Sequence, residues 1–426
     1  MILPSFSLLA KVKLKFQILP VGICLLSTAI LFGQERNLEF YIESGLQNSP
    51  LLKDYRNQKM SNLIDSIRII AAYKPQLNGV SINNYAPTNN GWGYDGAITN
   101  GVNFSQLVVA SKRLVSKESL QIQQEVIQIL NESLSITGKI SEKDLSKSIT
   151  AQYITAYGNW QQYNFNSDIL RLLKKEEMIL KKLTENGIYR QTDYLSLLVT
   201  IQQQEILISQ ISIQFQNDFS TLNYLCGIKD TTAIPLKTPV ILLAIVPEVE
   251  NTVFYQQFRI DSLKLKNNSE LIEYNYKPKA NLYADGGYLT SFTDQAYKNF
   301  GFSFGVNLSV PIYDGKQKKM QHDKLNIAEQ TRQNYRDYFK KQFDQQIAQL
   351  SQQLKLTQEL ISQTDKQIKY TETLIEANRI LLETGDVRMS DYILAIGNYL
   401  TIRNIKTQNN ITKLQLINQI NYWNKK

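Results

Sequence analysis

The chain has little of what most enzymes use for chemistry. Its 426 residues include one histidine, His322, and two cysteines, Cys24 and Cys226. A single histidine excludes multi-histidine metal sites and His-based triads. Cys226 has no histidine or helix start nearby that would make it a nucleophile, and no glycine-rich phosphate loop occurs. We therefore expect no catalytic residues, no metal site and no cofactor, and the chain is not predicted to be an enzyme.

Disulfides are excluded as well, because Cys24 lies in a segment typical of a signal peptide. Three lysines precede an apolar run over 16–32, which a proline and a glycine interrupt, and the small residue Gly33 follows. A basic region, an apolar stretch and a small residue at a cleavage site are removed on export. We predict a signal peptide over 1–33, which leaves Cys226 as the one thiol. A membrane anchor helix is the alternative interpretation.

Charge is not concentrated in any one segment. The formal net charge is +9, but the lysines are spread along the long polar stretches rather than gathered in one arm. A solvated helix face explains such a distribution better than a nucleic-acid interface does. We expect no nucleic-acid partner.

A repeated motif organises the chain. Residues 185–195 read ENGIYRQTDYL and residues 383–393 read ETGDVRMSDYI, which share the pattern E-x-G-x-x-R-x-[ST]-D-Y-[LI]. The tripeptide YKP and the pentapeptide GVN[FL]S also occur twice, in the same order and again about 200 residues apart. We predict two copies of one unit, a first repeat over 34–227 and a second over 249–426, joined by a proline-containing connector over 228–248.

Each copy contains a pair of predicted strands, at about 76–108 and 279–312. Over 300–312, apolar residues alternate strictly with small or polar ones, which is the period of a strand with one apolar face. Four strands are too few for even the smallest membrane barrel of about eight strands, so several chains must share one barrel. A small soluble sheet is the alternative interpretation of the same alternation.

Very long helices are predicted between the strand pairs and the repeated motifs. The range 316–384 contains no proline, and no glycine follows Gly315 until Gly385. Its apolar residues recur every three or four positions, as in a coiled-coil seam. A continuous helix over that range is about 100 Å long. The counterpart at 111–186 is predicted to be less regular around Gly138. Helices of this length indicate a tube rather than a compact domain.

Together these features resemble the TolC outer-membrane efflux family over essentially the whole mature chain. The resemblance rests on the duplicated strand pairs, on VPIYDG at 310–315 and on the paired Gly-x5-Asp turns. It implies an α+β membrane protein: a homotrimeric outer-membrane β-barrel of twelve strands, four per chain, continued by a long periplasmic α-helical barrel. The first copy departs from the pattern, because QLVVA at 106–110 lacks the proline and glycine.

The resemblance also implies a function. The protein is expected in the cell outer membrane, in contact with its lipid and with helices extending into the periplasm. It would be the passive duct of a tripartite efflux or type I secretion system, with a periplasmic adaptor protein and an inner-membrane pump as partners. The alternative is a non-transporting coiled-coil interaction protein at the cell surface.

The repeated turn motif is predicted to end one helix and begin the next. Gly187 and Gly385 would close the long helices, because glycine adopts the left-handed conformation of a helix C-cap. Thr192 and Ser390 are predicted to cap the returning helices. By the resemblance, the two glycine turns would also be the helix tips that contact the adaptor.

The same motif carries the predicted periplasmic gate. Asp193 and Asp391, each six residues after a glycine, match the family's constriction aspartates, and Arg190 and Arg388 are included as their candidate partners. In a trimer each aspartate would occur three times, and a ring of carboxylates favours cations. The remaining gate positions of the family do not carry over, since Leu382, Val387 and Leu394 occupy them here. Helix capping alone is the alternative explanation of the motif.

Overall fold

The computed structural model describes residues 36–87, 90–93, 101–114, 116–291 and 297–424. The predicted signal peptide at 1–33 lies outside these residues, as does part of each loop that joins a strand pair. The elements follow in the order α1 Leu38–Asn48, α2 Pro50–Ala71, β1 Gln76–Ala86, β2 Gly101–Leu114, α3 Lys117–Glu185, α4 Gln191–Cys226, a 3-10 turn Val249–Asn251, α5 Val253–Asn275, β3 Lys279–Thr290, β4 Phe300–Ser309, α6 Gln317–Thr384 and α7 Met389–Asn421.

The two long helices are continuous. α3 has 69 residues and α6 has 68, which corresponds to about 100 Å each. The irregularity predicted near Gly138 is absent, so that expectation was wrong. One glycine costs a helix only about 1 kcal/mol relative to alanine, which the packing on either side offsets. A Cβ at Gly138 would meet only the ring of Tyr55, at 3.8 Å.

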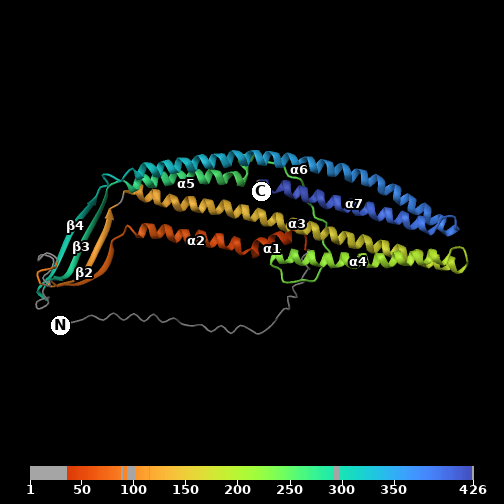
Figure 1. The fold of residues 1–426 in the computed structure, drawn as a ribbon, viewed down its shortest axis with the longest axis horizontal. Helices are drawn as coiled ribbons and strands as arrows, with labels where there is room; N and C mark the ends of the chain where they lie inside the picture. The colour runs from red at the N-terminus through yellow and green to blue at the C-terminus, as the bar shows by residue number, and fades with distance from the viewer. Residues whose placement is uncertain (1–35, 88–89, 94–100, 115, 292–296, 425–426) are drawn as a thin grey trace, which may run out of the picture. The chain divides into compact units, whose positions relative to one another are not determined.

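The helices form one layer with a defined order. On the side of the sheet, α2 packs on α3, α3 on α5 and α5 on α6. Toward the two turns the order is α4, α3, α7 and α6. Figure 1 shows α5 and α7 following one another along α6, with the strands at one end and the turns at the other. α2 and α4 lie at one side of this layer, and α6 lies at the other.

The four strands form one antiparallel sheet in the order β1-β2-β3-β4. β2 continues to Leu114, beyond the predicted end at about 108 and into the range predicted as helix from 111, because it pairs with β3 as far as Leu114 opposite Ala280. The predicted start of that helix was therefore wrong, and α3 begins at Lys117. β4 ends at Ser309, so the predicted end at about 312 was wrong; Pro311 follows, and its ring nitrogen cannot donate to a strand partner. Among the described strands, β1 and β4 each have a partner on one side only, so both outer edges of the sheet are open.

One face of the sheet is apolar over its second strand pair. The side chains of Phe300, Phe302, Phe304, Val306 and Leu308 all point to this face and are 65–83% exposed. The strict alternation predicted for this strand is confirmed. The first pair is more mixed, because Gln106 lies on the same face and donates from Nε2 to Ser81 Oγ at 2.7 Å and Asn83 Oδ1 at 3.1 Å.

The largest apolar cluster lies midway along the helical layer, between the end that carries the sheet and the end that carries the turns. It joins α1, α3, α4 and the connector around the fully buried Tyr41, Tyr153 and Phe219. Tyr153 Oη donates to the carbonyl of Lys237 at 2.7 Å and so holds the connector against α3. The end of α7 binds the next part of the connector, because Asn421 Nδ2 donates to Leu242 O at 2.7 Å.

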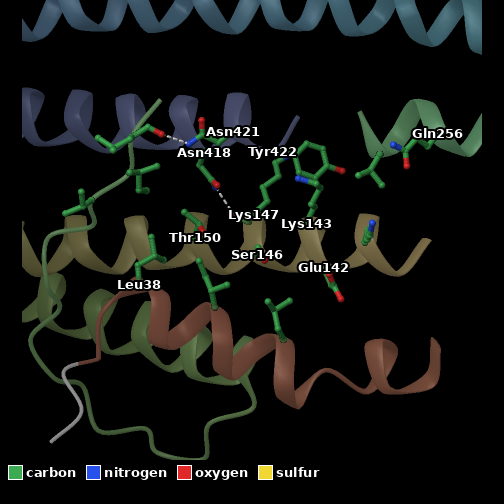
Figure 2. A pocket seen from close by; sticks show the side chains of 17 residues that line it. Leu38, Glu142, Lys143, Ser146, Lys147, Thr150, Gln256, Asn418, Asn421 and Tyr422 are labelled. Atoms are coloured by element: carbon green, nitrogen blue, oxygen red, sulfur yellow. Dashed lines mark hydrogen bonds between the residues drawn. The ribbon is translucent and has the colours of Figure 1, made fainter. Parts of the chain in front are cut away.

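A cavity of about 670 Å³ lies beside the connector (Figure 2). α1, α3, α5 and the last turn of α7 contribute its walls. Figure 2 shows Asn418 reaching α3, where its Nδ2 donates to the carbonyl of Lys147 at 2.9 Å. The Lys147 ammonium lies 4.3 Å from the centre of the Tyr422 ring, a cation–π contact. The end of α7 therefore fastens α3 and the connector together.

Candidate functional site

The first repeated turn ends α3 and begins α4. Gly187 adopts φ +80°, the left-handed conformation, and Ile188 N donates back to Leu183 O at 2.9 Å. This backward hydrogen bond is that of a Schellman motif, which satisfies carbonyls at the end of a helix. Gly187 thus ends the helix as predicted. A residue with a Cβ would be strained at this φ, although nothing lies within 4 Å of the position.

The second repeated turn has the same geometry between α6 and α7. Gly385 adopts φ +81°, and Asp386 N donates to Leu381 O at 2.9 Å. In both turns the residue three positions after the glycine is the N-cap of the next helix, Arg190 for α4 and Arg388 for α7. The prediction that Thr192 and Ser390 cap these helices was wrong, because both lie inside the first helical turn.

The two predicted gate aspartates differ in their surroundings. Asp193 is half-buried, and its Oδ2 accepts a hydrogen bond from the backbone N–H of Arg190 at 3.2 Å. This contact is the returning half of a capping box. Asp391 occupies the same helical position, but its side chain is exposed, and its carboxylate accepts no hydrogen bond from the described residues, although its backbone N–H donates to Arg388 O at 3.0 Å. Asp193 therefore stabilises a helix end, whereas the carboxylate of Asp391 faces solvent.

The side chains of the two predicted gate arginines form no ion pair with these aspartates among the described residues of the protomer. Both Arg190 and Arg388 are exposed, and neither takes part in the ion pairs found among the described residues. Their shared role in this structure is to begin a helix with an extended backbone, at ψ 152° and 142°.

The two turns contact one another through Tyr189. Its hydroxyl donates to Val387 O at 2.8 Å and lies 3.2 Å from Leu382 O, so one side chain of the first turn binds two carbonyls around the second. Beneath this contact lies an apolar cluster from α3, α4, α6 and α7, including Leu197, Leu382 and Met389, all fully buried. The paired turns, residues 185–191 and 383–389, therefore form one packed unit.

Sequence reasoning missed a charged group next to the paired turns. Arg379 of α6 donates from Nε and Nη2 to Glu376, at 3.0 and 2.8 Å, and from Nη1 to Glu383 at 3.1 Å. Glu176 of α3 lies near this arginine and is only 3% exposed. The available signal was the position of Glu176 between Leu173 and Leu180 on the buried face of the helix.

Cys226 and His322, the two residues considered for chemistry in the sequence, both have contacts that stabilise the fold. The Cys226 thiol is fully buried, and burial raises its pKa to about 12, so it stays protonated and unreactive. The Nε2 of His322 lies 3.0 Å from Glu273 Oε1. The described residues contain no group of three His, Cys, Asp or Glu side chains that could hold a metal ion.

None of the helices in the described part of the chain combines the length and the apolarity that a membrane span requires. No protein-family model and no curated protein sequence matches the chain. Solved structures do match. CusC, described as forming a transmembrane channel, is 13% identical at a TM-score of 0.74 over 92% of this chain and 93% of its own.

Two outer-membrane proteins also match over similar lengths. VceC of Vibrio cholerae, an outer membrane protein, is 15% identical at a TM-score of 0.71 and covers 91% of this chain and 95% of its own. The open state of the outer membrane channel MtrE of Neisseria gonorrhoeae is 10% identical at a TM-score of 0.71, over 91% and 88%. The chain has the fold of TolC-like outer-membrane channels.

Proposed function

We propose that the protein is one of three identical subunits of an outer-membrane duct that exports substrates passively. The observation that carries this proposal is that the sheet and the helical layer of the described protomer each have two open edges, one on either side. The sheet has free edges at β1 and β4, and the helical layer ends in α2 and α4 on one side and in α6 on the other. A head-to-tail contact between unlike edges generates a ring when the rotation closes.

Apolar stripes run along these outer helices. On α2 the stripe is Met60, Leu63, Ile64 and Ile67, each 61–68% exposed. Spacings of three and four place such residues on one helical face. The stripe of α4 is Leu195, Val199, Ile206 and Ile213, and α6 carries Met320, Ile327, Leu356, Leu360, Tyr370 and Leu374. Exposed apolar surface of this extent marks an interaction site, and a second copy of the chain offers the complementary edge.

The strand number agrees with a trimer. One protomer supplies four strands, fewer than the roughly eight of the smallest closed membrane barrel, and three protomers supply twelve. Pairing β4 of one copy with β1 of the next would give hydrogen-bond partners to the backbone groups of both open edges. Every backbone polar group in lipid requires such a partner. We place the barrel in the outer membrane and the helices in the periplasm, by analogy with the channels of the same fold.

The paired turns would then lie at the periplasmic end of the duct. Gly187 and Gly385 are the predicted contacts of a periplasmic adaptor protein, which would link the duct to an inner-membrane pump. Asp193 and Asp391 would line the narrow end, with Arg190 and Arg388 able to meet them across subunits. Substrate would be driven by the pump, as in a tripartite efflux or type I secretion system, and the duct would perform no chemistry.

Electron microscopy of protein extracted from membranes in detergent tests this proposal. The expected particle has three-fold symmetry, with a helical stem on the order of 100 Å long. A monomer released without detergent would refute the duct and favour the non-transporting surface protein.

A further inference from the structure

Glu176 is the one charged side chain among the buried residues that the structure describes. It is 3% exposed, and the fully buried Leu173 and Leu180 lie about one turn before and after it on α3. A carboxylate withdrawn from water in this way is strongly disfavoured unless a cation and hydrogen bonds compensate it. Its surroundings therefore decide which protonation state fits the packed helices.

α7 presents a neutral partner to this carboxyl group. Tyr392 is fully buried beside Glu176, and its hydroxyl makes no hydrogen bond of good geometry. α4 contributes Tyr194, whose hydroxyl donates to Glu177 Oε1 at 3.2 Å, the neighbouring glutamate of α3. Neither contact supplies a cation to Glu176.

α6 presents one cation and two further acids. The Arg379 guanidinium is hydrogen-bonded to Glu376 and Glu383, so three carboxyl groups share one positive charge. Burial raises the pKa of Glu176, and Glu383 and Glu376 add to that effect, whereas Arg379 and Tyr392 oppose it. The packed arrangement of α3, α6 and α7 therefore shifts Glu176 toward its protonated form.

We propose that Glu176 is a proton-sensitive latch, whose neutral form holds α3 against α6 and α7 beside the paired turns and whose ionised form loosens that packing. The inference rests on the proposed duct, whose periplasmic end the latch would regulate. Because the folded-state pKa is raised, the stabilisation is complete below the ordinary pKa of glutamate. It is lost as the pH rises through the raised value. Acid therefore keeps the end of the duct closed, and a rise in pH favours opening.

Single-channel recording of the trimer between about pH 4 and pH 8 tests the latch. The wild type is expected to gain conductance, at least about twofold, as the pH rises through the Glu176 pKa. Glu176→Gln keeps the shape of the side chain without its charge, so it should remain in the low-conductance state throughout. Glu132→Gln, which removes an exposed glutamate of the same helix far from the paired turns, is the matched control and should respond to pH as the wild type does.

Arg379→Gln provides a second test. The ionised form of Glu176 would lose its neighbouring cation, so the conductance change should move to higher pH. A pH response that persists unchanged in Glu176→Gln would overturn the latch while leaving the duct intact. Absence of conductance in all variants at every pH would instead refute the proposed function. Hydrogen exchange over residues 389–396, corrected for its intrinsic pH dependence, would then test the latch alone. The wild type should lose protection at high pH and Glu176→Gln should not, and equal behaviour would refute the latch.

Discussion

An arginine on either face of β4 should distinguish a lipid-facing surface from a lumen-facing one. β4 has ten residues, which span about 34 Å along the strand. At a tilt of about 40° its height is about 26 Å, which matches the apolar band of a membrane barrel. Phe304 is near the middle of the strand and 79% exposed, so it is expected at the bilayer midplane. Ser303 precedes it on the opposite face.

The expected costs follow from these positions. Phe304→Arg should destabilise the barrel by about 2–4 kcal/mol in each subunit, or about 6–12 kcal/mol for the trimer. Ser303→Arg is the matched control, because Ser303 Oγ donates to Asp285 Oδ2 at 2.7 Å and an arginine there would meet that carboxylate. Its expected cost is below about 1 kcal/mol per subunit.

Thermal dissociation of the detergent-solubilised trimer, followed by gel electrophoresis, measures the difference. Phe304→Arg should dissociate at much lower temperature than the wild type or fail to assemble in the membrane, and Ser303→Arg should resemble the wild type. Equal behaviour of the two variants would show that the row from Phe300 to Leu308 does not face lipid, and the barrel would be wrong.

Three other predictions follow from the edges and the turns. Met60→Cys with Ile327→Cys, in a Cys226→Ser background, should give cross-linked dimers and trimers on oxidation, because both positions lie roughly 15 Å from the sheet end of their helices. Each single-cysteine variant should run as a monomer on a denaturing gel. A double-cysteine variant that also runs as a monomer would contradict the proposed edge contact. Asp391→Ala should reduce the cation preference of the channel more than Asp193→Ala does. Asp193→Ala should cost more stability, about 1 kcal/mol, as measured by denaturant unfolding. Equal effects of the two substitutions on stability would mean that the hydrogen bond between Asp193 and Arg190 is unimportant. Tyr189→Phe should weaken the paired turns by about 1 kcal/mol, so hydrogen exchange of the second turn should be about fivefold faster, and unchanged exchange would refute that role.

Local sequence signals predicted the elements that local interactions determine. The absence of proline and glycine before Gly385 was sufficient to predict α6, and the left-handed requirement at Gly187 and Gly385 predicted both helix ends. The end of β2 was not predictable in this way, because residues 111–114 carry no strand signal of their own. They extend the strand because β3, from the other half of the chain, pairs with them.

The candidate site shows the same division. The shared motif predicted two equivalent aspartates, and it placed both at the same helical position. It could not predict that Tyr189 would bind carbonyls at residues 382 and 387, or that Glu176 would be buried beside a tyrosine and an arginine of the other half. These contacts depend on how α3 packs against α6 and α7, which no short segment encodes.

The difference between the two aspartates bears on how a gate could work. Asp193 already accepts a backbone hydrogen bond, so opening the duct would not free it unless the first turn of α4 also unwound. Asp391 has no such commitment and can meet cations or a neighbouring subunit without any cost to its own helix. If the turns do form a constriction, its charge should therefore come mainly from Asp391, and Glu176 should set how firmly the helices behind it are held.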